Sequence, residues 1–511
     1  MRSENSIKNI AVNLVSQLLG VLLSFVCRTV FIRTLGETYL GVSGLFSNIL
    51  SLLSLAELGI GTSIIFSMYK PLAENDRKKI GALMGLYKRA YHMVGFIVAA
   101  AGLALTPFYH FFISGSPGIP NLTLIYLLYV FNSAVTYFFS YKQNIILADQ
   151  KGYVCALYQY GFCIVQNVLQ IFILFRTRNF ILYLCVQILF SFFTNFFLAA
   201  KAEKMYPYLK RYRNAKLARA DRDSIFKNIR AMFLSRIGGA VVNGTDNLLI
   251  SKFFGLVSVG IYSNYFLITN TLNNLTSQIF SGMIASVGNL GAVESDRKSY
   301  EVYLSVNFAG FWIFGFCSVC LLCLFNPFIR LWMMWTGRGE ELLFPMSAVF
   351  WIVLNFYATG MRQTTITFKN ALGLFWYDRY RAIVEAAVNL GMSILLARHF
   401  GISGIFVGTF ISTMAIDFWV EPFVLFRHGF HRSAVPYFMR YVFYTALIFT
   451  VGFFSWYLCA LVPGYSILSF AAKCGICLAF PNLLLFLVFC RTKEFQYLKG
   501  FVRLPAFLRK K

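Results

Sequence analysis

Apolar stretches of about 20 residues recur along the whole chain, and they constrain its fold more than any other feature. A helix of this length crosses a hydrocarbon core of about 30 Å. The 511 residues are 58% hydrophobic and only 13% charged, whereas soluble proteins carry about 25% charged residues. Because lipid offers the backbone no hydrogen-bond partners, the spanning segments must be helices. The sequence therefore predicts an all-α integral membrane protein.

We count fourteen such stretches and interpret each as a transmembrane helix. Their approximate bounds are 10–32, 42–68, 90–113, 121–147, 153–175, 180–200, 229–251, 260–287, 303–326, 344–367, 380–398, 402–426, 439–462 and 467–489. No small-residue cleavage pattern follows the first stretch, so we expect it to remain in the mature protein.

The basic residues behind the net charge of +26 are concentrated in alternate connections between the predicted spans. If the N-terminus is inside, 35 of the 46 Lys and Arg residues lie in segments on the inner side and seven in segments on the outer side. Cytoplasmic loops of membrane proteins carry this excess of basic residues. The pattern predicts that both termini are cytoplasmic, and it makes nucleic acid a poor alternative as a partner.

Two cysteine-rich stretches, "CSVCLLC" from Cys317 and "CGIC" from Cys474, have the CxxC spacing. Both lie inside apolar runs without histidine or carboxylate neighbours. Cysteine in such a setting behaves as a small apolar residue. We therefore predict packing for these cysteines, with no metal site.

An internal repeat relates the first two spans to the seventh and eighth. Residues 9–46 align without gaps to 228–265 with six identities in 38 positions, including the pairs Gly36/Gly255 and Gly41/Gly260. Six spans separate the copies, so the repeat is parallel. We predict an N-lobe of six helices (1–200), a basic cytoplasmic linker (201–228), a C-lobe of helices seven to twelve (229–430), and a terminal helix pair with a basic tail (431–511).

Polar stripes follow corresponding faces of the two repeat copies. At 100° per residue, Gln17 and Arg28 lie within about 40° of a common direction on the first helix. Arg236, Asn243 and Asn247 form one line on the seventh helix, with Asp246 about 80° away. Polar groups in hydrocarbon are costly and face a bundle interior or a wet cavity. The stripes therefore predict a polar cavity between two lobes, although interhelical packing remains an alternative at each position.

Further charged or polar residues stand within predicted spans. They include Glu57 on the second, Asn274 on the eighth, Arg362 on the tenth and Asp417 on the twelfth. Sequence motifs of ATP hydrolysis, zinc proteolysis and serine hydrolysis do not occur in the chain. We expect a transporter and no enzyme, with a membrane glycosyl-polymerase as the less favoured enzymatic alternative.

Three stretches carry a resemblance to a known family. They are "LSLAELGIGTSIIFSMYKPLAENDRKKIGALM" from Leu53, "NGTDNLLISKFFGLVSVGIYSNY" from Asn243, and "GISGIFVGTFIS" with "EPFVLFRHGF" between Gly401 and Phe430. The chain resembles the Wzx-type polysaccharide-transport flippases of the MOP exporter superfamily, which also contains the MATE exporters and the MurJ lipid II flippases.

The resemblance implies a MATE-like pair of six-helix lobes, with a C-terminal helix pair closer to the MurJ architecture. It also implies translocation of undecaprenyl-pyrophosphate-linked oligosaccharide from the inner to the outer leaflet of the bacterial cytoplasmic membrane by alternating access, for surface polysaccharide biosynthesis. Lipid II transport and multidrug or cation antiport by a MATE-type exporter remain alternatives.

Such a substrate needs cations for its pyrophosphate, and arginine donates paired hydrogen bonds to phosphate oxygens. We expect Arg28, Arg236 and Arg362 to contact the pyrophosphate, and Gln17, Asn243, Asn247 and Asn274 to line the cavity. Glu57, Asp246 and Asp417 are expected either to bind a coupling ion or to pair with the arginines.

No cofactor is expected, and a proton gradient, a sodium gradient or the membrane potential could each supply the energy. Besides the lipid-linked glycan and membrane lipids, polysaccharide polymerase and glycosyltransferases are expected partners. We expect the protein to be a monomer.

Overall fold

The computed structural model describes residues 2–57, 60–113, 118–149, 151–212, 215, 217–293, 296–334, 342–374 and 377–502. Within these ranges the chain is helical almost throughout and contains no strand. The helices form two compact units, Met1–Ser263 and Asn264–Lys511.

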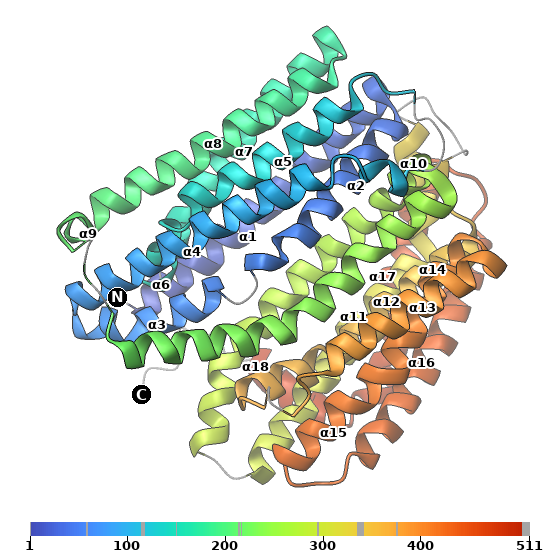
Figure 1. Cartoon of the computed structure of the whole chain (residues 1–511). Helices are drawn as coiled ribbons and strands as arrows, with labels where there is room; N and C mark the ends of the chain where they lie inside the picture. Colours follow the sequence, from blue (N-terminus) through green and yellow to red (C-terminus); the bar gives the residue numbers. More distant parts are fainter. Residues whose placement is uncertain are drawn as a thin grey trace. The chain divides into compact units, whose positions relative to one another are not determined.

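The first unit begins with a long helix and continues through several interrupted ones. Its elements are α1 (Arg2–Leu35), α2 (Glu37–Leu53), η1 (Ser54–Glu57), α3 (Ile60–Glu74), α4 (Arg77–Ala104), η2 (Tyr109–Phe112), α5 (Leu122–Ser140), α6 (Gln143–Ala148), α7 (Gly152–Thr177), α8 (Phe180–Met205), α9 (Tyr208–Arg211) and the first part of α10 (Arg219–Val293). Within this unit α5, α7 and α8 pack side by side (Figure 1).

The second unit contains the rest of α10 and the helices after it. They are α11 (Asp296–Met334), α12 (Met346–Ala371), α13 (Arg381–Phe400), α14 (Ile402–Ser412), the π-helical turn η4 (Thr413–Asp417), α15 (Phe418–His428), α16 (Val435–Ala460), α17 (Ile467–Phe489) and α18 (Lys493–Val502). The C-terminal pair α16 and α17 packs on α11.

The fourteen predicted spans fall largely on these helices. Eight helical segments of the described chain are both long and apolar enough to cross a membrane, namely α5, α7, α8, α11, α13, α14 to α15, α16 and α17. Other predicted spans are broken or carry more charge. The second span, for example, is split among α2, η1 and α3, and α4 begins with the charged sequence Arg77–Lys79.

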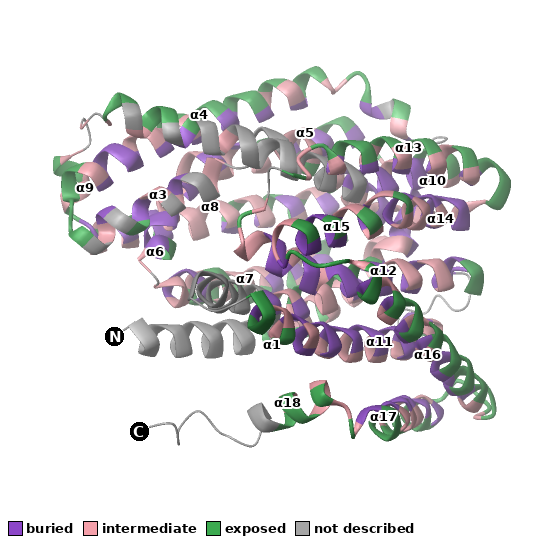
Figure 2. Ribbon diagram, turned by 90° about the horizontal axis from the view of Figure 1, so that it is seen from below, coloured by how far each residue is buried: buried purple, intermediate pink, exposed green. Residues whose placement is uncertain are grey.

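The surface of the C-terminal helices is apolar. Exposed large side chains include Met439 and Phe453 on α16 and Leu468 and Leu478 on α17. Figure 2 shows exposed residues along both helices and a long buried face on α11. A contiguous apolar surface of this kind suits lipid and not water, so the fold is that of a multi-pass membrane protein.

Aromatic rings hold the C-terminal pair on α11. The ring centroids of Phe311 on α11 and Tyr444 on α16 lie 4.0 Å apart, and those of Phe308 and Phe489 lie 5.1 Å apart. Trp312 Nε1 also donates a hydrogen bond to Asn482 Oδ1 on α17 at 2.9 Å. Aromatic pairs in edge or stacked geometry contribute about 0.5–1.5 kcal/mol beyond their area burial, so the pair is an integral part of the unit.

The internal repeat has a structural counterpart at its glycine landmarks. Gly36 (φ 90°, ψ 177°) ends α1, and Gly255 (φ 80°, ψ 172°) interrupts α10 in nearly the same conformation. This region of backbone space is essentially restricted to glycine. The predicted helix–turn–helix landmark therefore exists in both copies.

The segments that follow these two glycines cross each other within the first unit. A Cβ on Gly41 would lie 1.9 Å from the carbonyl oxygen of Leu256, and a Cβ on Gly260 would lie 2.5 Å from that of Glu37. The two contacts are equivalent under the repeat, since Glu37 corresponds to Leu256 and Gly41 to Gly260. In each copy, the lack of a side chain at Gly41 or Gly260 lets the backbone of the other copy approach closely.

The first part of α10, up to Ser263, belongs to the first unit. The boundary between the units falls after Ser263, whereas the sequence suggested that the C-lobe begins at residue 229. The close backbone contacts of Gly41 and Gly260 explain why the start of the second repeat copy packs with the first. The lobe bounds drawn from the repeat stay a prediction.

A substitution at this crossing tests the repeat. Gly41→Ala should lower the melting temperature of the detergent-solubilised protein, because its Cβ would overlap the Leu256 carbonyl, and overpacking typically costs about 1–3 kcal/mol. Gly161→Ala on α7 is the matched control, since no atom lies within 4 Å of its added Cβ. A Gly41→Ala protein that melts with the wild type would contradict the crossing.

Candidate functional site: a buried charge network and a polar cavity

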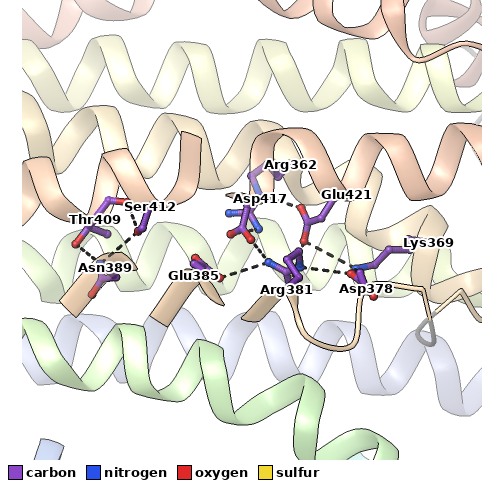
Figure 3. Close-up of polar contacts among 10 residues, drawn as sticks. All are labelled: Arg362, Lys369, Asp378, Arg381, Glu385, Asn389, Thr409, Ser412, Asp417 and Glu421. Carbon is purple, nitrogen blue, oxygen red and sulfur yellow. Dashed lines mark hydrogen bonds and ion pairs between the residues drawn. The ribbon is translucent and has the colours of Figure 1, made fainter. Parts of the chain in front are cut away.

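A network of buried ion pairs joins α12, α13, η4 and α15 in the second unit (Figure 3). At its centre, Arg362 Nη2 lies 2.6 Å from Asp417 Oδ2, and Arg362 Nε donates a hydrogen bond to Glu421 Oε2 at 2.9 Å. The exposed fractions of these residues are 6%, 1% and 1%. An unpaired charge at such depth is costly, so each carboxylate requires its arginine.

Two further cations extend the network toward the loop before α13. Lys369 pairs with Asp378, and Arg381 pairs with Asp417. Arg381 Nη2 also lies 3.4 Å from Glu421 Oε1, and its Nη1 lies 3.4 Å from Glu385 Oε2. Arg381 Nε also lies 3.3 Å from Asp378 Oδ2, so Arg381 contacts four carboxylates.

The described members of the network comprise three cations and four carboxylates, so one carboxylate is in excess. The cations are Arg362, Lys369 and Arg381, and the anions are Asp378, Glu385, Asp417 and Glu421. With all groups ionised the cluster carries one negative charge, which a proton or a metal cation could offset.

The π-helical turn η4 allows one helix to supply both ends of this polar face. In a π turn the hydrogen bonds join residues five apart, so Ser412 and Asp417 lie near the same side. Ser412 faces Asn389 on α13, whose Nδ2 donates to Thr409 Oγ1 at 3.0 Å. Pro422, which has no N–H to donate, follows in α15. Turns of this kind inside helices are frequent at functional sites.

A polar cavity of about 340 Å³ lies in the first unit. Its lining residues come from η1, α4, α5 and α6 and are all polar, namely Glu57, Tyr91, Ser133, Thr136, Tyr137, Ser140, Gln143 and Asn144. The helix break at Ser54–Glu57 positions the carboxylate of Glu57, which accepts a hydrogen bond from the hydroxyl of Tyr91. Tyr87 and Asn144 continue the chain, with Asn144 Nδ2 donating to Tyr87 Oη at 2.5 Å. The cavity can hold a small polar group or an ion beside one carboxylate.

Arg28, on α1, interacts with two residues of the first unit, Ser263 and Tyr183. Its Nη2 donates a hydrogen bond to the neutral hydroxyl of Ser263 at 2.6 Å, and Tyr183 on α8 lies within electrostatic range. Arg28 is half-buried. Arg362 is more deeply buried than Arg28, and its guanidinium contacts two carboxylates.

The other predicted site residues have mixed outcomes. Asp246 and Asn247 are buried on α10 in the first unit, and Asn247 Oδ1 accepts no hydrogen bond from the described residues. Asn274 is exposed on α10 in the second unit. The side chains of Gln17, Arg236 and Asn243 lie outside the described residues. Arg28 and Arg362 belong to different units, and their joint role with Arg236 stays a prediction.

Several residues of these two sites were not predicted from the sequence. Lys369, Asp378 and Arg381 lie at the end of one helix, in the loop and at the start of the next, where charges ordinarily face solvent. Tyr91, Gln143 and Asn144 line the cavity because α5 ends at Ser140 and α6 begins at Gln143. The break between α5 and α6 falls in the polar run of residues 140–144, which the predicted span 121–147 included.

No protein-family model and no curated protein sequence matches the chain. Solved structures do match. An inward-facing multidrug resistance MATE family transporter of the MOP superfamily is similar over 82% of this chain and 97% of its own, with a TM-score of 0.64 and 14% identity. The lipid II flippase MurJ, in an inward closed conformation, is similar over 94% of this chain and 99% of its own, with the same TM-score and identity.

A MATE transporter of Vibrio cholerae gives a TM-score of 0.55 at 14% identity, over 84% of this chain and 99% of its own. These similarities show a shared fold. The chain shares the fold of these MATE transporters and of the lipid II flippase MurJ, which is the fold that the sequence resemblance implied.

Removing the central arginine tests the charge network. Arg362→Met should destabilise the protein by about 3–5 kcal/mol, because it leaves Asp417 and Glu421 buried with one cation fewer. Thermal unfolding in detergent measures the effect, and adding Asp417→Asn to Arg362→Met should recover part of the loss.

Arg297→Ala serves as the control because its ion pair with Glu301 is exposed. Pairs of that kind contribute little, so the melting temperature should not change measurably. If Arg362→Met were as stable as Arg297→Ala, the network would not support the fold.

Proposed function

We propose that the protein translocates an undecaprenyl-pyrophosphate-linked oligosaccharide across the bacterial cytoplasmic membrane by alternating access, for surface polysaccharide biosynthesis. The observation that carries the proposal is the extent of the similarity to a lipid II flippase, which covers 94% of the chain against 82–84% for the MATE structures described above. A lipid-linked substrate is therefore favoured over a soluble drug.

The sequence resemblance to Wzx-type flippases supplies the finer choice of substrate. A glycan needs polar contacts, and the cavity beside Glu57 in the first unit can hold one small polar group of such a substrate. The pyrophosphate needs a cation. Arg362 is held by Asp417 and Glu421, so an anion would have to displace a buried carboxylate there. We assign the phosphate contact to Arg28 and Arg236, which stand on the corresponding polar faces of the two repeat copies, and a positioning role to Arg362.

The membrane potential can supply the energy. Moving one elementary charge through 100 mV is worth about 2.3 kcal/mol, so export of a substrate with two negative charges gains roughly 4–5 kcal/mol. A coupling cation would add to this. Glu57 is the preferred coupling group because it accepts a hydrogen bond from a neutral hydroxyl in a polar cavity, whereas Asp417 is paired with two arginines.

The proposal places the protein in the cytoplasmic membrane with both termini inside, as a monomer beside polysaccharide polymerase and glycosyltransferases. The rival substrates are lipid II and the cationic drugs of multidrug exporters, since structures of both protein types share the fold. These rivals are distinguished by the transport assay below.

Reconstituted protein should move a fluorescent undecaprenyl-pyrophosphate oligosaccharide between the leaflets of liposomes. Flux should rise with an imposed inside-negative potential, and Arg28→Ala should reduce it at least tenfold while Arg28→Lys keeps part of it, because lysine retains the charge but not the paired geometry. Arg33→Ala is the control, since Arg33 lies exposed on the same helix. Leaflet exposure is followed by a membrane-impermeant quencher.

Transport of lipid II alone, without the oligosaccharide carrier, would replace the proposed substrate by the first rival. Efflux of a cationic dye without movement of either lipid would support the multidrug exporter. Equal flux in Arg28→Ala and Arg33→Ala would remove the phosphate assignment.

Glu57 is tested by ion dependence. Glu57→Gln should abolish any acceleration of flux by a proton or sodium gradient and leave the response to the membrane potential unchanged. Glutamine has nearly the shape of glutamate but no carboxylate that can take up a proton or attract a sodium ion. Glu74→Gln on α3 is the control, as Glu74 is exposed. Gradient acceleration that persists in Glu57→Gln would transfer the coupling role to another carboxylate.

A further inference from the structure

Three cysteines from three different helices meet in the second unit. They are Cys323 of α11, Cys459 of α16 and Cys477 of α17, and their sulfur atoms all lie within 4.8 Å of one another. Cys459 Sγ and Cys477 Sγ are 3.7 Å apart. The exposed fractions of the three residues are 5%, 4% and 0%. The three cysteines are not a CxxC motif, because the two cysteines of such a motif stand on one helix and each member of this cluster comes from a different helix.

We propose that Cys323, Cys459 and Cys477 form a three-thiolate site for monovalent copper. Thiolates are soft ligands that select soft metals such as monovalent copper. Structural zinc sites ordinarily have four protein ligands. This cluster has three, and among the residues that the structure describes no histidine or carboxylate belongs to it. Three sulfur atoms around a common point suit a trigonal copper ion.

A cavity of about 270 Å³ gives the site an entry path and charge compensation. Cys323 and Cys459 line it, together with Arg330, Lys473 and Tyr465. Tyr465 lies in the turn between α16 and α17, so the cavity reaches the end of that helix pair. The guanidinium of Arg330 stacks over the Tyr465 ring at 3.5 Å, and the ammonium of Lys473 lies 5.7 Å from the same ring.

These two cations match the charge of the loaded site. Each thiol loses one proton when its sulfur binds the metal, so three thiolates and one monovalent copper ion carry two negative charges. No electron is transferred, because copper enters in the oxidation state that it keeps. A buried anion needs compensation, and Arg330 and Lys473 supply two positive charges at the wall of the same cavity.

The metal would fasten the C-terminal pair to the unit. One ligand comes from each of α16 and α17 and the third from α11, on which the pair packs. A ligand that binds only the folded protein raises its apparent stability. The site is independent of the substrate, and its test is therefore separate from that of the transport proposal.

The experiment is a competition for copper. Full-length protein in detergent is mixed without oxygen with monovalent copper and a coloured copper chelator, and the metal retained after gel filtration is counted. Wild-type protein should retain one copper ion per chain and melt at a higher temperature with copper than without. Cys477→Ser should lose both effects.

Cys317→Ser and Cys474→Ser are matched controls, because both cysteines are half-buried on α11 and α17 but lie outside the cluster. They should retain copper as the wild type does. X-ray absorption of the loaded wild type needs no variant and should show three sulfur neighbours around the metal.

Wild-type protein that keeps no copper against the chelator would overturn the proposal, as would equal retention by Cys477→Ser. So would a copper shell of nitrogen or oxygen neighbours, or a Cys459–Cys477 disulfide found by mass spectrometry in protein taken directly from the membrane.

Discussion

The free-energy cost of an unsatisfied polar group in hydrocarbon governs this structure. It forces the chain into helices, whose backbone groups bond within each segment, and it forces every buried charge to find a partner. The network of Arg362, Asp417 and Glu421 is the clearest case, since all three residues are almost fully buried. The two irregular helical turns η1 and η4 each contain a carboxylate of a candidate site, Glu57 and Asp417.

The same constraint explains how much could be predicted from the sequence. The length of the apolar stretches predicted the spans. Charges inside those spans identified candidate site residues, namely Arg28, Glu57, Arg362 and Asp417. The repeat was visible at Gly36 and Gly255 because a positive φ leaves little choice of residue. These signals are local or periodic, and a single sequence contains them.

The partners of those charges could not be predicted, because they depend on which helices meet. Arg381 and Glu421 stand near predicted span ends, where a solvated charge is the ordinary expectation, yet both belong to the buried network. Cys323, Cys459 and Cys477 are separated by more than a hundred residues at the widest and share no motif. The helical periodicity of a sequence indicates on which face of its own helix a residue lies. It does not indicate which other helix packs against that face.

The pairing of charges also bears on how a negatively charged substrate could be handled. An anion that approached Arg362 would compete with two carboxylates already in contact with it, and removing either carboxylate from its arginine leaves a buried charge exposed to low dielectric. Arg28 donates one hydrogen bond to the neutral hydroxyl of Ser263. A phosphate oxygen in the place of that hydroxyl would pair the guanidinium with an ionised acceptor, which adds the attraction of opposite charges to the hydrogen bond. Both arginines stand inside predicted spans, and exchange of the Ser263 hydroxyl for a phosphate oxygen at Arg28 leaves the carboxylates of the network paired with Arg362.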